Sequence, residues 1–176
     1  MKKRTQKENL KRKGGLRALN KEPKNGIVVI LDNIKSMFNV GAIFRTCEGA
    51  RVEKIILCGI TATPPRDKIY KTSMGTVDMV QWQYYKKTEN AIADLKKSKY
   101  TIVALEQTDS SKHYKKAEYN FPIAVVLGHE KNGVSKAVLN QCDFSVEIPM
   151  YGRANSLNVA TSAGIIIYEI LSRARR

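Results

Sequence analysis

Three loops contain most of the polar side chains that could form a binding or catalytic site. Segments 36–45, 128–135 and 149–158 are rich in Gly, Asn, Ser and Glu, and each comes where an apolar run typical of a strand ends. Each loop alone is a weak signal, because Asn39 could simply cap a helix and Asn132-Gly133 could form an ordinary turn. In an open α/β sheet, however, ligands bind beyond the carboxyl ends of the strands, so the loops predict one shared site.

The cysteines and histidines favour neither a metal site nor a disulfide. Cys47, Cys58 and Cys142 are far apart and form no C-x-x-C pair. His113 and His129 lack partner ligands at a recognised metal spacing. We therefore expect reduced cysteines that pack in the interior and no bound metal.

The elements that must position these loops alternate along the chain. Apolar runs predict strands at 26–32, 54–59, 80–85, 101–106, 122–128 and 144–149. Helices are predicted at 40–50, 88–99, briefly after Ser135, and from 157 to about 173, with Asn39, Thr88 and Ser135 as caps. One stripe of the last helix is expected to carry Leu157, Ala160, Gly164, Ile165, Tyr168 and Leu171. This alternation predicts one α/β domain with a mostly parallel sheet covered by helices on both faces.

Positive charge is concentrated at the N-terminus. The chain has 31 Lys and Arg against 16 Asp and Glu, a formal net charge of +15. Residues 1–24 contain ten Lys or Arg and two Glu, which gives +8. We expect a basic arm at 1–24, a domain at 25–176 and a polyanionic partner. The arm lacks the apolar run of a signal peptide and no run is long enough to span a bilayer, so a cytoplasmic protein without membrane contact is expected.

Three motifs together resemble a known family. Asn39 to Arg45 (NVGAIFR), Leu127 to Ser135 (LGHEKNGVS) and Ile148 to Ala160 (IPMYGRANSLNVA) are similar to the SpoU, or TrmH-like, branch of the SPOUT methyltransferases. The resemblance runs from about Gly26 to the C-terminus and excludes the arm. It implies a C-terminal deep trefoil knot, which topology rules alone would argue against. It also implies a homodimer that transfers a methyl group from S-adenosylmethionine to a ribose 2′-hydroxyl of structured tRNA or rRNA.

The resemblance also assigns site residues. Arg45 corresponds to the principal catalytic residue, and a guanidinium that stays protonated suits holding a phosphate and stabilising an alkoxide better than acting as a base. The catalytic set is Arg45, Asn39, Glu130, Ser156 and Asn158, although Ser156 or Asn158 could simply start the last helix. The cofactor set is Leu105, Gly128, Ile148, Met150, Leu157 and Ala160, with Glu106 and Thr108 beside Leu105. In the arm, the expected phosphate contacts are Lys2, Lys3, Arg4, Lys11, Arg12, Lys13 and Arg17. Gly128 is expected to let the chain pass close to a ligand, His129 receives no role, and Lys71 to Gly75 could touch RNA or form a surface turn.

Two other functions are compatible with parts of the sequence. A non-catalytic RNA-binding or ribosome-assembly factor could keep this fold without turnover. The basic arm alone would also suit a membrane surface or an acidic protein, because Lys-rich segments do not discriminate among polyanions.

Overall fold

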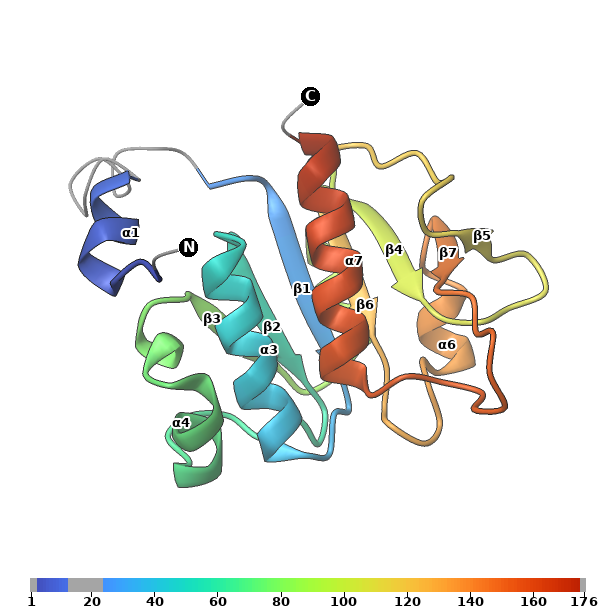
Figure 1. Ribbon diagram of the computed structural model, residues 1–176. Coiled ribbons are helices and arrows are strands. Elements are labelled where there is room, and N and C mark those ends of the chain that lie inside the picture. Colours follow the sequence, from blue (N-terminus) through green and yellow to red (C-terminus); the bar gives the residue numbers. More distant parts are fainter. Residues whose placement is uncertain (1–2, 13–23, 175–176) are drawn as a thin grey trace.

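A seven-stranded parallel sheet forms the centre of the computed structural model, which describes residues 3–12 and 24–174 (Figure 1). Every pair of neighbouring strands is parallel, and their spatial order is β3-β2-β1-β6-β4-β7-β5. The strands are β1 (Ile27–Asp32), β2 (Lys54–Cys58), β3 (Trp82–Tyr85), β4 (Thr101–Leu105), β5 (Lys112–His113), β6 (Ile123–Leu127) and β7 (Phe144–Glu147). Six strands are those predicted; the two-residue β5 is polar and carries no apolar pattern from which to predict it.

Helices cover both faces of the sheet, which confirms the predicted fold class. One apolar core joins the sheet to α3 (Met37–Gly49), α4 (Asp67–Ser73) and α7 (Val159–Ala174). A second core joins the opposite face to α5 (Thr88–Lys97) and α6 (Lys136–Leu139). The remaining described helices are α1 (Gln6–Arg12) and the 3-10 turn η1 (Thr76–Asp78). The knot implied by the family resemblance stays a prediction.

Strand β1 shows why the central strands read as continuous apolar runs. Ile27, Val29 and Leu31 belong to the core shared with α3 and α7, while Val28 and Ile30 belong to the core on the other face. Successive side chains of a strand point to opposite faces, so a strand covered on both sides must be apolar at every position. All five residues are fully buried.

Helix α3 begins three residues before the predicted start. Ser36 is its N-cap, and the Ser36 hydroxyl oxygen accepts the backbone N–H of Asn39 at 3.4 Å. The prediction that Asn39 caps this helix is therefore wrong, because Ser36 already occupies the capping position. The Asn39 side chain is left available for the site.

The cap predicted for α5 is also wrong, whereas the cap predicted for α6 is confirmed. Lys87 precedes α5 and makes no side-chain cap, while the Thr88 hydroxyl donates to the buried carboxylate of Asp32. A buried carboxylate needs hydrogen-bond donors, and this need overrides the local preference of Thr for a cap. Ser135 caps α6 by accepting the N–H of Val138 at 3.4 Å.

The buried face of α7 differs from the predicted stripe. Its buried residues are Ala163, Ile166, Ile167, Ile170 and Leu171, whereas Tyr168 is 51% exposed. Because apolar residues lie on several sides of this helix, periodicity alone allowed more than one stripe, and packing against α3 and the sheet decided between them.

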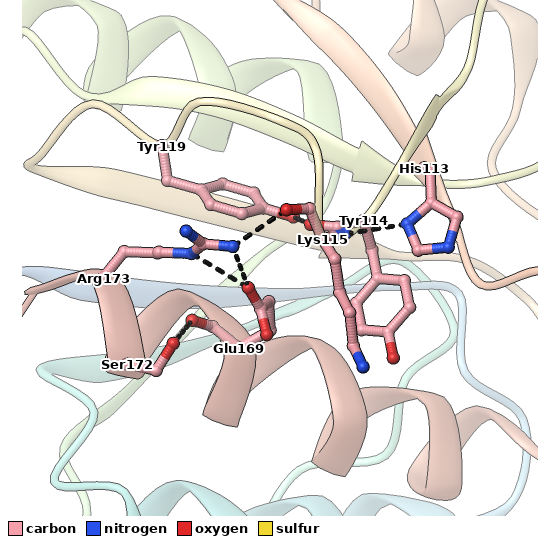
Figure 2. A network of polar contacts seen from close by, with 7 residues as sticks. All are labelled: His113, Tyr114, Lys115, Tyr119, Glu169, Ser172 and Arg173. Atoms are coloured by element: carbon pink, nitrogen blue, oxygen red, sulfur yellow. Dashed lines mark hydrogen bonds and ion pairs between the residues drawn. The ribbon is translucent and has the colours of Figure 1, made fainter.

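Polar contacts join the C-terminal end of α7 to the segment that follows β5 (Figure 2). Glu169 Oε1 accepts from Arg173 Nε at 2.9 Å and from Nη2 at 2.7 Å, and the same Nη2 donates to the carbonyl of Lys115 at 2.8 Å. Beside them, the hydroxyl of the buried Tyr119 donates to the carbonyl of Tyr114, and burial raises the Tyr119 pKa. These contacts hold α7 against segment 113–119.

The described part of the basic arm contains the short helix α1. A capping box starts it, in which the Thr5 N–H donates to the Glu8 carboxylate at 2.7 Å and the Glu8 N–H donates to the Thr5 hydroxyl at 3.2 Å. Lys3, Arg4, Lys11 and Arg12 are exposed, while Lys2, Lys13 and Arg17 lie outside the described residues. Within 3–12 and 24–174, no helix combines the length and apolarity needed to cross a membrane.

Candidate functional site

A cavity of about 590 Å³ opens at the carboxyl ends of β4, β6 and β7. Leu105 ends β4, Leu127 ends β6, and Ile148 directly follows β7, so three neighbouring strands direct their following loops into the same space. This is the edge of a parallel sheet at which ligands bind. Its walls are Leu105, Glu106, Gln107, Leu127, Gly128, His129, Glu130, Lys131, Gly133, Glu147, Ile148, Met150, Asn155, Ser156, Leu157, Asn158, Val159 and Ser162.

The carboxylate of Glu130 joins this cavity to the start of α3. Its Oε2 accepts the N–H of Lys35 at 2.9 Å, and its Oε1 accepts both the N–H of Ser36 and the side-chain amide of Asn39 at 2.9 Å. Partial burial raises the Glu130 pKa, but these donors outweigh it and hold the pKa below its ordinary value. Glu130 is therefore ionised at neutral pH and is suited to positioning groups rather than to removing a proton.

Asn158 extends the network to the start of α7. Its Oδ1 accepts the N–H groups of Ala160 at 2.9 Å and Thr161 at 3.3 Å, as a helix cap does. Its Nδ2 must therefore face Asn39, and it donates to Asn39 Oδ1 at 3.1 Å. The amide nitrogen of Asn39 is then the group left to donate to Glu130. Asn158 thus both caps the helix and belongs to the site, and the orientation of each amide fixes that of the next.

Gly128 packs closely against the returning backbone of its own loop. A Cβ atom at this position would lie 2.2 Å from the carbonyl carbon of Gly133 and 2.3 Å from the nitrogen of Val134. The lack of a side chain makes room for the loop's own backbone, which folds back beside the end of β6. Gly128 also lines the cavity, and its expected closeness to a ligand stays a prediction.

Glu106 and His129 hold this loop in shape, and the sequence assigned them little or no function. Glu106 Oε2 accepts the N–H of Val134 at 2.8 Å. The lack of a side chain at Gly133 makes room for this carboxylate, because a Cβ there would lie 2.1 Å from Oε2. His129 Nδ1 accepts the N–H of Lys131 at 3.0 Å, as an Asn side chain does in an Asx turn. The turn-type pair Asn132-Gly133 was the one feature of the sequence that indicated a tight turn here, and hence a side chain to hold it.

The structure brings most of the predicted cofactor residues together. Of that set, the cavity walls include Leu105, Gly128, Ile148, Met150 and Leu157. Ala160 is not among them and packs against the core instead. Ser156 is exposed and lines the cavity, whereas Thr108 pairs its hydroxyl with that of Ser145 at 2.8 Å and lies outside the walls.

Arg45 lies apart from the cavity. It is exposed on α3, does not line the walls, and makes no hydrogen bond or ion pair within the described residues. Six residues separate it from Asn39, which is about 9 Å along a helix axis. The guanidinium is thus available to a partner that reaches across α3 from the cavity.

The segment from Lys71 to Gly75 forms the last turn of α4 and its exit. Met74 and Gly75 both adopt the left-handed conformation there, with φ of 54° and 80°. In the described part of the chain, no three His, Cys, Asp or Glu side chains cluster in a way that could hold a metal ion.

The fold is thus a parallel α/β sheet covered by helices on both faces, with a cavity at its carboxyl edge. A Glu–Asn–Asn network beside the cavity links the starts of α3 and α7, which defines the class as an α/β domain with a candidate ligand site. The chain belongs to the SpoU rRNA methylase family, whose model matches residues 26–168. The family resemblance is thereby confirmed.

One curated relative and three solved structures illustrate the match. A protein of Staphylococcus saprophyticus, assigned to the TrmH family of tRNA/rRNA methyltransferases, is 30% identical over 152 residues, which is 86% of this chain and 61% of the relative. The chain thus spans about three fifths of that relative's length.

The solved structures share the fold with 25–28% identity. The TrmH/SpoU tRNA modifying enzyme of A. aeolicus is 28% identical with a TM-score of 0.81, covering 96% of this chain and 84% of that one. An AdoMet-bound rRNA methyltransferase of Sinorhizobium meliloti is 27% identical with a TM-score of 0.80, covering 86% and 57%. A structure described as an RNA 2′-O ribose methyltransferase is 25% identical with a TM-score of 0.77, covering 88% and 58%.

Proposed function

We propose that this protein is an S-adenosylmethionine-dependent RNA methyltransferase that modifies a ribose 2′-hydroxyl of tRNA or rRNA. The observation that carries the proposal is the network of Asn39, Glu130 and Asn158 at the mouth of the cavity, built from the three motifs that the family shares. The AdoMet-bound relative supports the cofactor, and the ribose 2′-O methyltransferase with the same fold supports the acceptor atom.

The cavity suits the cofactor in size and charge. Its volume lies within the range of small-molecule sites, about 300–1,000 Å³. Leu105, Met150 and Leu157 supply apolar surface for an adenine and a methionine side chain. Carboxylates outnumber lysines in the walls, which favours the cationic sulfonium over neutral or anionic ligands. When bound, S-adenosylmethionine supplies an electrophilic methyl group.

The chain's own residues orient the acceptor. The 2′-hydroxyl is a weak nucleophile until its proton is polarised, so positioning and charge must supply the rate enhancement. Asn158 and Ser156 line the cavity. Asn39 lies behind them, and its bonds to Asn158 and Glu130 fix the orientations of both amides. Glu130 accepts three hydrogen bonds and keeps this arrangement in place. The guanidinium of Arg45, exposed on α3 outside the cavity walls, binds an RNA phosphate.

RNA is the partner in this proposal, with the basic arm adding phosphate contacts outside the site. Arg4 and Lys11 are exposed there, and contacts of this kind add affinity without reading sequence. A homodimer and a cytoplasmic location complete the proposal. Removing residues 1–24 should weaken RNA binding and reduce its salt dependence while S-adenosylmethionine affinity is unchanged.

The decisive test is transfer of radiolabelled methyl groups from S-adenosylmethionine to undermodified total RNA, followed by digestion to nucleosides and mass spectrometry. We expect label on a ribose 2′-oxygen, lost in Arg45→Ala and retained in Lys116→Ala, which removes an exposed positive charge on the β5–β6 connection. Label on a base would refute the ribose assignment. No label on tRNA or rRNA, from folded protein that binds the cofactor by calorimetry, would favour the non-catalytic RNA-binding or assembly factor.

A further inference from the structure

The connection between β2 and α4 carries a buried threonine that none of the three motifs includes. Thr61 is 3% exposed, and its hydroxyl makes two hydrogen bonds to the chain at the end of β1. The hydroxyl accepts the N–H of Ile34 at 2.9 Å and donates to the carbonyl of Leu31 at 3.1 Å. A single side chain thus bridges both ends of the turn formed by residues 31–34.

Asn33, inside this turn, joins the same two segments a second time. Its Oδ1 accepts the N–H of Ile60 at 3.1 Å, and its Nδ2 therefore faces the other way and donates to Asp32 Oδ1 at 2.8 Å. The φ angle of Asn33 is 59°, a left-handed conformation that Asn tolerates. A Cβ at Gly59 would lie 2.1 Å from Asn33 Oδ1, so the lack of a side chain there lets the amide lie against the connection. Residues 59–61 therefore hold the turn at its middle as well as at its ends.

The turn leads directly to the two backbone donors that hold Glu130. Lys35 and Ser36 follow it, and their N–H groups donate to the two carboxylate oxygens of Glu130 at 2.9 Å. Because peptide bonds are planar and each residue has only two free backbone dihedrals, fixing the N–H of Ile34 limits where the next two N–H groups can point. The same carboxylate accepts the side-chain amide of Asn39, so a displacement of the turn is passed on to the polar network of the site.

These two segments lie outside the cavity itself. None of residues 31–36 and 59–61 is among the cavity walls, whereas Glu130 and Asn158 are. A change at Thr61 therefore alters the polar network without removing a surface on which the cofactor would lie. Its effect separates positioning of the acceptor from binding of the cofactor.

We infer that Thr61 is a positioning residue of the proposed active site, acting through the turn at 31–34 on the two backbone donors that hold Glu130. The inference rests on the proposed function and adds a residue outside the three motifs. Thr61 touches neither cofactor nor substrate; it fixes the geometry in which Asn39 and Asn158 meet the acceptor. A misplacement of about 1 Å caused far from the reacting atoms can lower a rate about 100-fold, so a contact at this distance affects the reaction.

Amide hydrogen exchange measured by NMR on the full-length protein tests the inference without requiring turnover. Thr61→Val replaces the hydroxyl by a methyl group and removes both hydrogen bonds, whereas Thr61→Ser keeps the hydroxyl. Asn33→Gly removes the second contact, and glycine adopts the left-handed φ without strain. Tyr100→Phe is the matched control, because it removes one hydrogen bond, to Glu53 at 2.7 Å, where β2 and β4 begin.

The amides of Lys35 and Ser36 report the position of the turn. We expect Thr61→Val and Asn33→Gly to speed their exchange at least about fivefold, the effect of one lost hydrogen bond on local opening. Thr61→Ser and Tyr100→Phe should leave it unchanged.

Methyl transfer gives a second readout, at a temperature at which circular dichroism shows every variant folded. Thr61→Val should lower kcat about 10- to 100-fold while the Kd for S-adenosylmethionine is unchanged, because the cavity walls stay in place. Thr61→Ser should restore kcat, and Tyr100→Phe should match the unchanged protein.

Unchanged exchange at Lys35 and Ser36 in folded Thr61→Val would overturn the inference, and if that variant is unfolded, unchanged exchange in Asn33→Gly would do so. Equal kcat in Thr61→Val and Tyr100→Phe would also overturn it, since the hydroxyl would then contribute to stability alone. Absence of methyl transfer by the unchanged protein, with Thr61-dependent exchange intact, would refute the proposed function and leave the positioning of Glu130 by Thr61 standing.

Discussion

Replacement of Gly128 by alanine tests whether the loop that carries Glu130 is built as described. The added Cβ would lie 2.2 Å from the carbonyl carbon of Gly133, 2.3 Å from the nitrogen of Val134 and 2.6 Å from the carbonyl oxygen of Gly133. Backbone atoms cannot rotate away as the end of a side chain can, so the loop must shift as a whole. Overpacking of this kind costs about 1–3 kcal/mol, and the clash with three backbone atoms predicts the upper end.

Urea denaturation followed by circular dichroism measures this loss, with Gly164→Ala as the matched control. A Cβ at Gly164 has no atom within 4 Å, and the residue lies inside α7. That variant should therefore gain about 0.5–1 kcal/mol from higher helix propensity. Both variants add one methyl group in place of a glycine hydrogen, and only the space available differs.

Cofactor binding gives a second readout of the same change. Displacement of the 128–134 loop moves Glu130 away from α3, so Gly128→Ala should weaken S-adenosylmethionine binding by calorimetry at least about tenfold, equivalent to about 1.4 kcal/mol. Gly164→Ala should bind normally. If Gly128→Ala lost less than about 0.5 kcal/mol of stability, the ordinary range for changes without a structural cause, the described packing of this loop would be wrong.

Three further predictions concern single side chains. His129→Ala should lower the free energy of unfolding by about 1 kcal/mol through loss of the turn's acceptor, and His129→Asn should restore it; equal losses in urea titrations would exclude the proposed anchoring. Since the folded-state pKa of Glu130 is lowered, its network stabilises fully above the unfolded value of about 4.3 and loses this contribution as pH falls through the folded value, so the stability difference between unchanged protein and Glu130→Gln should shrink only in acid. Burial raises the pKa of the Cys47 thiol, so iodoacetamide should modify it only in denaturant; mass spectrometry showing labelling of folded protein would contradict its burial.

Local patterns were sufficient for most of the secondary structure. The continuous apolar runs of β1 and β6 predicted strands covered on both faces, since such runs arise where neither side of a strand meets water. Patterns failed where the sequence offered equivalent choices. Ser36 and Asn39 are both good caps, but in the structure Ser36 caps α3 and the Asn39 side chain bonds to Glu130.

Contacts between distant segments decided what no local pattern could. Thr88 looked like a helix cap. Its hydroxyl instead donates to the buried carboxylate of Asp32, 56 residues away in the sequence, which needs a hydrogen-bond donor. No sequence pattern indicated that Gly128 also packs against the returning backbone of its own loop, at Gly133 and Val134.

The sequence by itself determined the class of fold, the family and the three loops from which the site is built, because strand and helix periodicities and short motifs are properties of neighbouring residues. Only the tertiary structure decided that Asn39, Glu130 and Asn158 form one hydrogen-bonded network, that Ala160 packs into the core, and that Arg45 lies exposed on α3 outside the cavity. The physical reason is that hydrogen bonds and exclusion from water depend on which segments meet in space. Residues 39, 130 and 158 meet only because parallel strands bring their following loops to one edge of the sheet.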